Sequence, residues 1–171
     1  MTRRHFDQPL KMFWACLALV VASLGTMSTA KAHQASDEAR DAEIMRVLDV
    51  FMDGLNELDL DKHFTAYHFP HFRYASGTIT IAENAEDFMP LLNTSKEQRR
   101  QNLLQYLGPD WDHSAWTKRD IVQADDTKVH VATTFVRFRK DGSKIQSYES
   151  LYIVTFEDGR WGIKGRSSFA Q

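Results

Sequence analysis

Apolar residues near the start of the chain recur at the spacing of a helix. They fall three or four positions apart: Ile44, Val47, Leu48, Phe51, Leu55 and Leu58. Charged residues fill the positions between them, so this segment predicts one long amphipathic helix with a single buried face. Ser36 is a suitable N-cap, and Asp37 and Glu38 follow it in the first turn, where the helix dipole favours negative charge.

From residue 114 onward the pattern becomes that of strands. We expect four strands, over residues 115–123, 128–139, 144–156 and 160–169. Turn signals stand between them, at residues 125–126, 141–142 and 158–159. Three successive hairpins predict an antiparallel meander. Two of the strands are apolar at both alternating positions, so we expect helices to cover one face of the sheet and a second subunit the other.

The segment between these two regions predicts short elements with defined ends. We expect a helix over residues 60–67 that ends before Pro70, a hairpin of residues 72–75 and 78–82, a helix from Asn84 to Leu92, and a helix that Ser95 begins and Gly108 ends. The order of elements therefore predicts an α+β domain with a curved antiparallel sheet wrapped around the long N-terminal helix.

With this order of elements, residues 33–171 resemble the nuclear transport factor 2-like superfamily, which includes SnoaL-like and ketosteroid-isomerase-like proteins. The segment 51–60, FMDGLNELDL, is similar to the end of that family's first helix, and the segment 157–163, EDGRWGI, to its final hairpin. The resemblance implies a cone-shaped, cystatin-like fold, an apolar cavity between sheet and helices, and frequent homodimers. Such a cavity would take a small apolar or aromatic molecule.

The first 32 residues have the pattern of an export signal. Arg3, Arg4 and Lys11 flank an apolar run over residues 12–25, and Ala30-Lys31-Ala32 offers a cleavage site. The arginine pair also resembles a twin-arginine export motif. Because the apolar run is shorter than the roughly 20 residues of a membrane-spanning helix, only an uncleaved signal would hold the chain at a membrane. We therefore expect a signal peptide over residues 1–32 and one periplasmic or secreted domain over residues 33–171.

Composition narrows the possible functions. The one cysteine, Cys16, lies within the expected signal, so the mature domain should have no disulfide, thiolate metal site or cysteine nucleophile. Removal of residues 1–32 leaves 21 − 4 = 17 basic and 23 − 1 = 22 acidic residues. This acidic balance argues against nucleic acid as a partner. The sequence has no dinucleotide or phosphate-loop motif, and we expect no cofactor.

The candidate chemistry lies in residues 59–77, which hold His63, His68 and His71 among aromatic residues on both sides of Pro70. Imidazole can serve as acid, base or ligand near neutral pH. The spacing suits neither a helical pair nor a hairpin pair of metal ligands, so we predict no metal site. His68 and His71 either hydrogen-bond backbone groups near the proline or reach a bound molecule, where one of them would be a catalytic general base.

Further residues are candidates for ligand contact: Tyr67, Arg73, Tyr74, Trp111, Tyr148 and Glu149. Arg73 and Tyr74 face opposite ways on a strand, so only one of them lines a given cavity. If Arg73 points inward and has no carboxylate partner, it is suited to bind an anionic group of a ligand. The aromatic residues could equally be core, and Glu149 could pair with Arg119 or Arg137. We expect Arg137 to lie at a solvated strand end.

The reaction of ketosteroid isomerase itself does not fit this sequence. Its oxyanion-stabilising tyrosine would fall on Phe51 and its general-base aspartate near Arg73 or Tyr74, so both groups are missing. We therefore favour an exported small-molecule-binding domain. The alternatives are an enzyme that uses His68 or His71 as general acid or base, and a dimeric interaction module without a ligand.

Overall fold

The computed structural model describes residue 34 and residues 36–169, with no side-chain description at residue 91. The chain divides into two compact units, residues 1–40 and 41–171. In the first unit, residues 34 and 36–40 are helical, and Arg40 pairs with Asp37 at 2.9 Å. The expected signal peptide and its cleavage site lie outside the described residues. No helix of the described part is long and apolar enough to cross a membrane.

The second unit begins with a helix over residues 41–56, as the apolar spacing predicts. Ile44, Leu48 and Phe51 are buried on its inner face, with exposed fractions of 0%, 0% and 3%. Leu58 then takes a positive φ of 57°, and the chain turns back into the short helix α2 (Leu60–Thr65). Asp59 caps α2 by accepting a hydrogen bond from the backbone N–H of Lys62 at 3.0 Å.

The helix α2 is shorter than the sequence predicts, because the following strand β1 (Tyr67–Ala75) begins before Pro70. Ala66 is the C-cap, and its carbonyl accepts a hydrogen bond from the N–H of Ile163 at 2.7 Å, so sheet pairing starts at this point. The expectation that Pro70 ends the helix is therefore wrong. The proline follows a cis peptide bond and lies where the register of β1 shifts, a position at which a strand tolerates the missing N–H.

The short elements after β1 follow the predicted caps. The strand β2 (Thr78–Ala82) pairs with β1, and the helix α3 (Ala85–Phe88), the 3₁₀ turn η1 (Pro90–Asn93) and the helix α4 (Lys96–Leu107) come next. Asn84 accepts a hydrogen bond from the N–H of Asp87 at 2.8 Å, and Ser95 accepts one from the N–H of Gln98 at 3.2 Å. Gly108 ends α4 with a φ of 95°.

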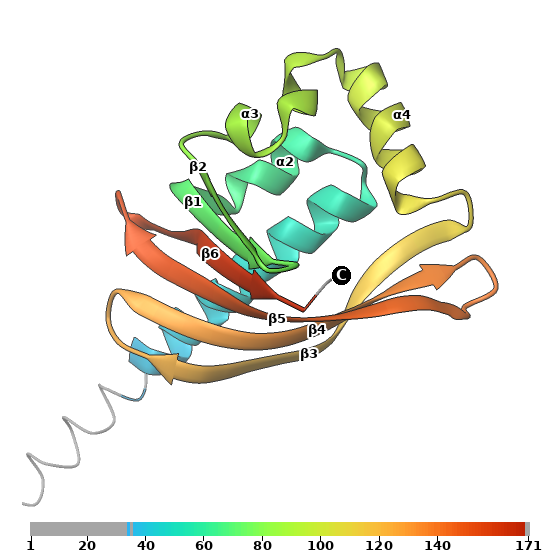
Figure 1. Ribbon diagram of the computed structural model, residues 1–171. Coiled ribbons are helices and arrows are strands. Elements are labelled where there is room, and N and C mark those ends of the chain that lie inside the picture. Colours follow the sequence, from blue (N-terminus) through green and yellow to red (C-terminus); the bar gives the residue numbers. More distant parts are fainter. Residues whose placement is uncertain (1–33, 35, 170–171) are drawn as a thin grey trace, which may run out of the picture. The chain divides into compact units, whose positions relative to one another are not determined.

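The last four strands form the predicted meander: β3 (Trp111–Ala124), β4 (Lys128–Arg139), β5 (Lys144–Glu157) and β6 (Arg160–Ser168). The six strands make one curved sheet in the order β2-β1-β6-β5-β4-β3, and the helices α2, α3 and α4 gather on its concave side (Figure 1). All neighbours run antiparallel except β1 and β6, which are parallel. The second unit is thus the α+β domain that the sequence predicts, with one parallel pair.

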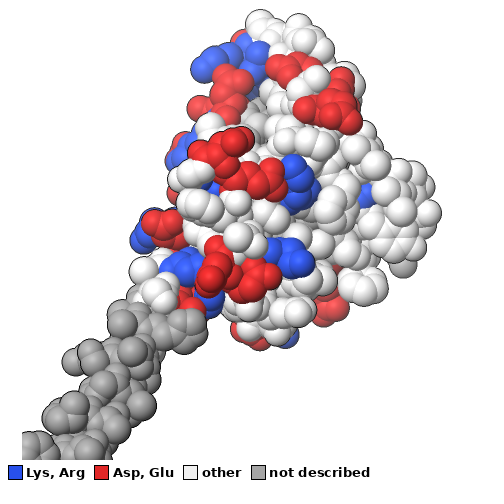
Figure 2. All heavy atoms as spheres, turned by 90° about the vertical axis from the view of Figure 1, so that its left-hand side faces the viewer, with Lys and Arg blue, Asp and Glu red and all other residues white. Residues whose placement is uncertain are grey.

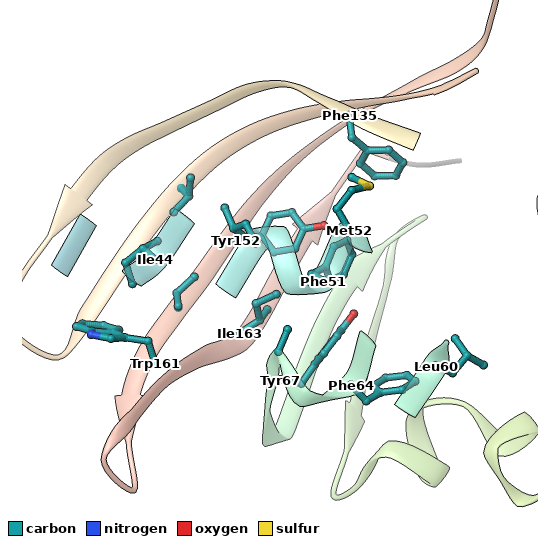
Figure 3. Close-up of a cluster of buried hydrophobic side chains, with 14 of the residues drawn as sticks. Ile44, Phe51, Met52, Leu60, Phe64, Tyr67, Phe135, Tyr152, Trp161 and Ile163 are labelled. Carbon is teal, nitrogen blue, oxygen red and sulfur yellow. The ribbon is translucent and has the colours of Figure 1, made fainter. Parts of the chain in front are cut away.

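The core fills the space between the helix over residues 41–56 and the concave face of the sheet. Tyr152 on β5 and Ile163 on β6 have exposed fractions of 0% and lie beside Phe51 of the helix (Figure 3). The ring of Phe51 meets that of Tyr152 edge to face at 5.5 Å. Burial of these large side chains is the main source of stability in a domain of this size.

Gly54 of the first helix lies in close contact with the backbone of α2, and this contact permits a test. A Cβ built on Gly54 would lie 2.4 Å from the backbone N of His63 and 2.5 Å from its Cα. We expect Gly54→Ala to lower the free energy of unfolding by about 1–3 kcal/mol, since backbone must move to accept the methyl group. Urea denaturation measures the loss. Glu43→Ala, at an exposed position of the same helix, is the control, and equal stability of both variants would contradict the close contact.

Candidate functional site

The candidate site is an aromatic cluster on the concave side of the sheet. Phe51 stands at its centre, with ring centroids 4.4 Å from His63, 5.9 Å from Tyr67 and 5.9 Å from Trp116. Figure 3 shows Tyr67 and Tyr152 on either side of Phe51, with Tyr67 approaching from β1 and Tyr152 from β5. The cluster therefore joins the first helix, α2 and the sheet.

His63 is held inside this cluster as a neutral ring. Its Nδ1 lies 2.7 Å from the carbonyl oxygen of Phe51, so this nitrogen carries the proton and donates. Its Nε2 accepts from the hydroxyl of Tyr67 at 3.2 Å. Burial lowers the pKa of His63 to about 4, against a weaker opposite effect of the Phe51 carbonyl. Both nitrogens are thus occupied, and the ring has a structural role.

Two arginines lie side by side on the same concave face. Arg73 on β1 and Arg166 on β6 are direct partners across the parallel pair, and Arg166 is in turn the partner of Tyr152 on β5. A guanidinium nitrogen of Arg166 donates to the Tyr152 hydroxyl at 3.1 Å. Burial, and then the charge of Arg166, lowers the pKa of Arg73. Arg73 nevertheless stays charged at neutral pH, because arginine has so high an intrinsic pKa.

A third arginine stands at the rim of the cluster. The guanidinium of Arg137 on β4 lies 5.2 Å from the ring centroid of Tyr106 on α4 and 5.0 Å from that of Tyr148 on β5. Tyr148 stacks on Phe135 at 4.7 Å. The expectation of a solvated strand end is therefore wrong for Arg137, which is half-buried between two aromatic rings.

None of these three arginines forms an ion pair with a carboxylate within residues 36–169. The Nε atoms of Arg73 and Arg137 are buried and have no hydrogen-bond partner there. On the face drawn in Figure 2, acidic and basic side chains lie interspersed beside a broad uncharged area. The concave side of the sheet thus carries positive charge that the described protein does not neutralise.

The two histidines of the catalytic prediction lie in different surroundings. His71 is 1% exposed, its ring lies 4.7 Å from that of Tyr67, and its Nδ1 donates to the carbonyl of Ile163 at 3.2 Å. Burial lowers its pKa to about 4. His68 packs instead against Gly162, where a Cβ would lie 2.6 Å from the imidazole, and its Nε2 donates to the carbonyl of Arg160 at 3.3 Å. Burial lowers the pKa of His68 as well.

The structure also separates the predicted ligand contacts. Tyr67, Arg73 and Tyr148 lie in or beside the aromatic cluster, whereas Tyr74 and Glu149 are exposed at positions of opposite parity on β1 and β5. Trp111 begins β3, and its indole N–H donates to the Ser114 hydroxyl at 3.1 Å. The Glu149 carboxylate forms no ion pair with its expected partners, Arg119 and Arg137, in the described part of the chain; Arg119 pairs with Asp49 instead.

Sequence reasoning missed Arg166 and did not select Tyr152 as a ligand contact. Neither residue belongs to a motif, and each joins the site through the sheet register. The only available signal was the strand parity that places Tyr152 with Tyr148 on one face of β5. In residues 36–169, no three His, Cys, Asp or Glu side chains are grouped to hold a metal ion.

The curved sheet, with helices over its concave face, defines an NTF2-like, cystatin-like domain. The family model described as NTF2-like protein (DUF6841) matches residues 40–167, and the chain belongs to this family. No curated protein matches the chain.

Three solved structures illustrate the likeness in fold. An NTF2-like protein with a cystatin-like fold from Novosphingobium aromaticivorans has a TM-score of 0.59 and 12% identity over 83% of this chain and 88% of its own. An NTF-2 like protein of unknown function from Shewanella oneidensis MR-1 has a TM-score of 0.58 and 16% identity over 77% and 99%. The association domain of CaMKII from C. elegans has a TM-score of 0.57 and 12% identity over 79% and 98%. At these identities the likeness concerns the fold alone.

Because His63 and His71 are buried as neutral rings, we expect the folded domain to lose stability in acid. His63 and His71 have pKa values of about 4 in the folded chain and near 6.5 when unfolded, so the unfolded state binds more protons below pH 6.5. Stability should be complete above pH 6.5 and fall as the pH drops toward 4. Between pH 6.5 and 5 the loss is on the order of 2 kcal/mol for each histidine.

Urea denaturation at pH 7 and pH 5 measures this loss. His63→Gln should reduce the difference between the two pH values. The control is Tyr67→Phe, which removes the hydroxyl that donates to His63 but keeps the titrating ring, and should lower stability at both pH values. A wild-type free energy of unfolding that does not change between pH 7 and pH 5 would contradict the assignment of neutral buried rings.

Proposed function

We propose that this domain binds a small, largely aromatic molecule at the concave side of its sheet. The observation that supports this function is the group of aromatic rings around buried arginine atoms that lack a partner in the described chain. Ligand sites combine an apolar wall with a few polar groups that fix orientation. In this proposal Tyr67, Tyr148 and Tyr106 contribute the wall, and the arginines contribute the polar groups.

The site chemistry favours binding over catalysis. A general base works best when its pKa lies near the working pH, and His71, the histidine beside the cluster, has a pKa of about 4. No carboxylate pairs with Arg73 or Arg166 in residues 36–169 to serve instead. The alternative, an enzyme that uses His68 or His71 as general acid or base, would be supported if a substrate were found whose turnover needs either ring.

We propose further that the protein is exported and dimeric. Export is supported by the signal pattern in residues 1–32. Self-association is supported by the exposed apolar residues Tyr74, Ile79 and Ile81, with exposed fractions of 48%, 68% and 67%. The register pairs Tyr74 with Ile79, so these side chains share one face of the β1–β2 hairpin. The similar fold of a CaMKII association domain agrees with this proposal.

Two tyrosines provide a matched test of the ligand site: Tyr106 on α4, over the concave side of the sheet, and Tyr74 on the other face of the sheet. Tyr106 lies over Arg137 and is 72% exposed, so Tyr106→Ala should leave the fold intact. We expect this variant to bind neutral aromatic probes such as 2-naphthol about threefold to tenfold more weakly, because one ring of the wall is lost. Titration calorimetry measures the affinity.

Tyr74→Ala is the control, since Tyr74 lies on the other face of the sheet. It should leave the affinity for 2-naphthol unchanged. Failure of 2-naphthol and other aromatic probes to bind saturably, or an equal loss of affinity in both variants, would reject the proposed site.

The dimer has its own test. The double variant Ile79→Asp, Ile81→Asp places two charges on the exposed face of β2, where a subunit contact would have to bury them. We expect sedimentation velocity at micromolar concentration to give a dimer for the wild type and a monomer for this variant. Thr78→Asp and Thr80→Asp on the same strand are the control, and a monomeric wild type would reject the proposal.

A further inference from the structure

The neighbouring arginines of β1 and β6 place two positive charges close together on one face of the sheet. Arg73 and Arg166 are direct cross-strand partners, so their side chains leave the sheet on the same face. Like charges directly opposite each other on a sheet are destabilising. The structure offsets this repulsion with one hydrogen bond, from Arg166 to the hydroxyl of Tyr152 at 3.1 Å.

Arg73 and Arg166 are shielded from water, but the described residues around them supply no carboxylate as a counter-charge. Arg73 and Arg166 are both partly buried, and the Nε of Arg73 has no partner in the described chain. The guanidinium of Arg166 lies 5.6 Å from the ring centroid of Tyr152, so an aromatic face covers one side of the cation. A buried cation without an anion is costly, and two such neighbours are costlier.

Partly buried cations that lie outside this concave face have acidic partners, unlike Arg73, Arg166 and Arg137. The Nζ of Lys164, two residues before Arg166 on β6, lies 2.9 Å from a carboxylate oxygen of Glu157. Arg119 on β3 pairs with Asp49 of the first helix. The absence of an ion pair for Arg73 and Arg166 in residues 36–169 is therefore a local property of the concave face.

We propose that Arg73 and Arg166 together bind the carboxylate of a small aromatic acid, whose ring packs against the tyrosines of the cluster. This inference rests on the proposed function and adds the charge of the ligand to it. A carboxylate fits because it is planar and can accept parallel hydrogen bonds from guanidinium groups. The rings of Tyr106 and Tyr148, which flank Arg137, would then contact the aromatic body.

The test compares two probes of nearly equal shape, 2-naphthoate and the neutral 2-naphthamide. We expect the wild-type protein to bind the carboxylate at least tenfold more tightly than the amide at pH 7, because charge-assisted hydrogen bonds are stronger than neutral ones. Arg73→Met and Arg166→Met should each weaken binding of 2-naphthoate by about tenfold to hundredfold and change that of 2-naphthamide little. Titration calorimetry measures all three proteins.

The control is Arg119→Met, which removes an arginine that already has an acidic partner. It should preserve the preference for 2-naphthoate. Circular dichroism establishes that each variant is folded, and Arg73→Met keeps the test decisive if Arg166→Met does not fold. Thermal unfolding adds a readout without ligand: Arg73→Met should raise the midpoint by relieving repulsion, whereas Arg119→Met should lower it.

The outcomes separate the inference from the function on which it rests. Equal affinity for 2-naphthoate and 2-naphthamide in the wild type would overturn the carboxylate site and leave an aromatic-binding domain in place. An affinity for 2-naphthoate that Arg73→Met leaves unchanged would do the same. If neither probe binds saturably, the proposed function and the inference both fail.

Discussion

The packing of the first helix against the concave face of the sheet is the contact on which the site depends. Phe51 meets Tyr152 at 5.5 Å, while Ile44 and Leu48 are fully buried beside it. This burial stabilises the domain, and it also excludes water from the polar groups that lie on the same face. The hydrogen bond from Arg166 to Tyr152 forms at the edge of this contact. Stability and site chemistry therefore arise from one layer of side chains.

Much of the fold could be predicted because its signals are local. The period of the first helix, the caps at Asn84 and Ser95, and the turn at Gly159 each depend on residues a few positions apart. Such signals act before any tertiary contact forms, so the sequence alone reveals them. They place the helices and hairpins within a few residues, and they led to the right superfamily.

The remainder depends on contacts between distant residues. The parallel pairing of β1 with β6 joins positions such as Arg73 and Arg166, which stand 166 − 73 = 93 residues apart in sequence. That pairing begins at Tyr67 and carries Pro70 into a strand, which local propensity does not predict. It also puts two arginines side by side. The sequence could name Arg73 as a candidate, but the second arginine and the missing counter-charge require the register.

The concave face differs from the rest of the domain in the pairing of its buried cations, and the unpaired charges there are all positive. Its arginines are desolvated but unpaired within residues 36–169, whereas Arg119 and Lys164 have acidic partners nearby. A sequence selected for stability alone would replace the unpaired cations with apolar residues, since that change is often stabilising. Sites of function are where proteins retain such locally unfavourable choices. Under the proposed function, the unpaired charge gives both the location of the site and the sign of the group that would bind there.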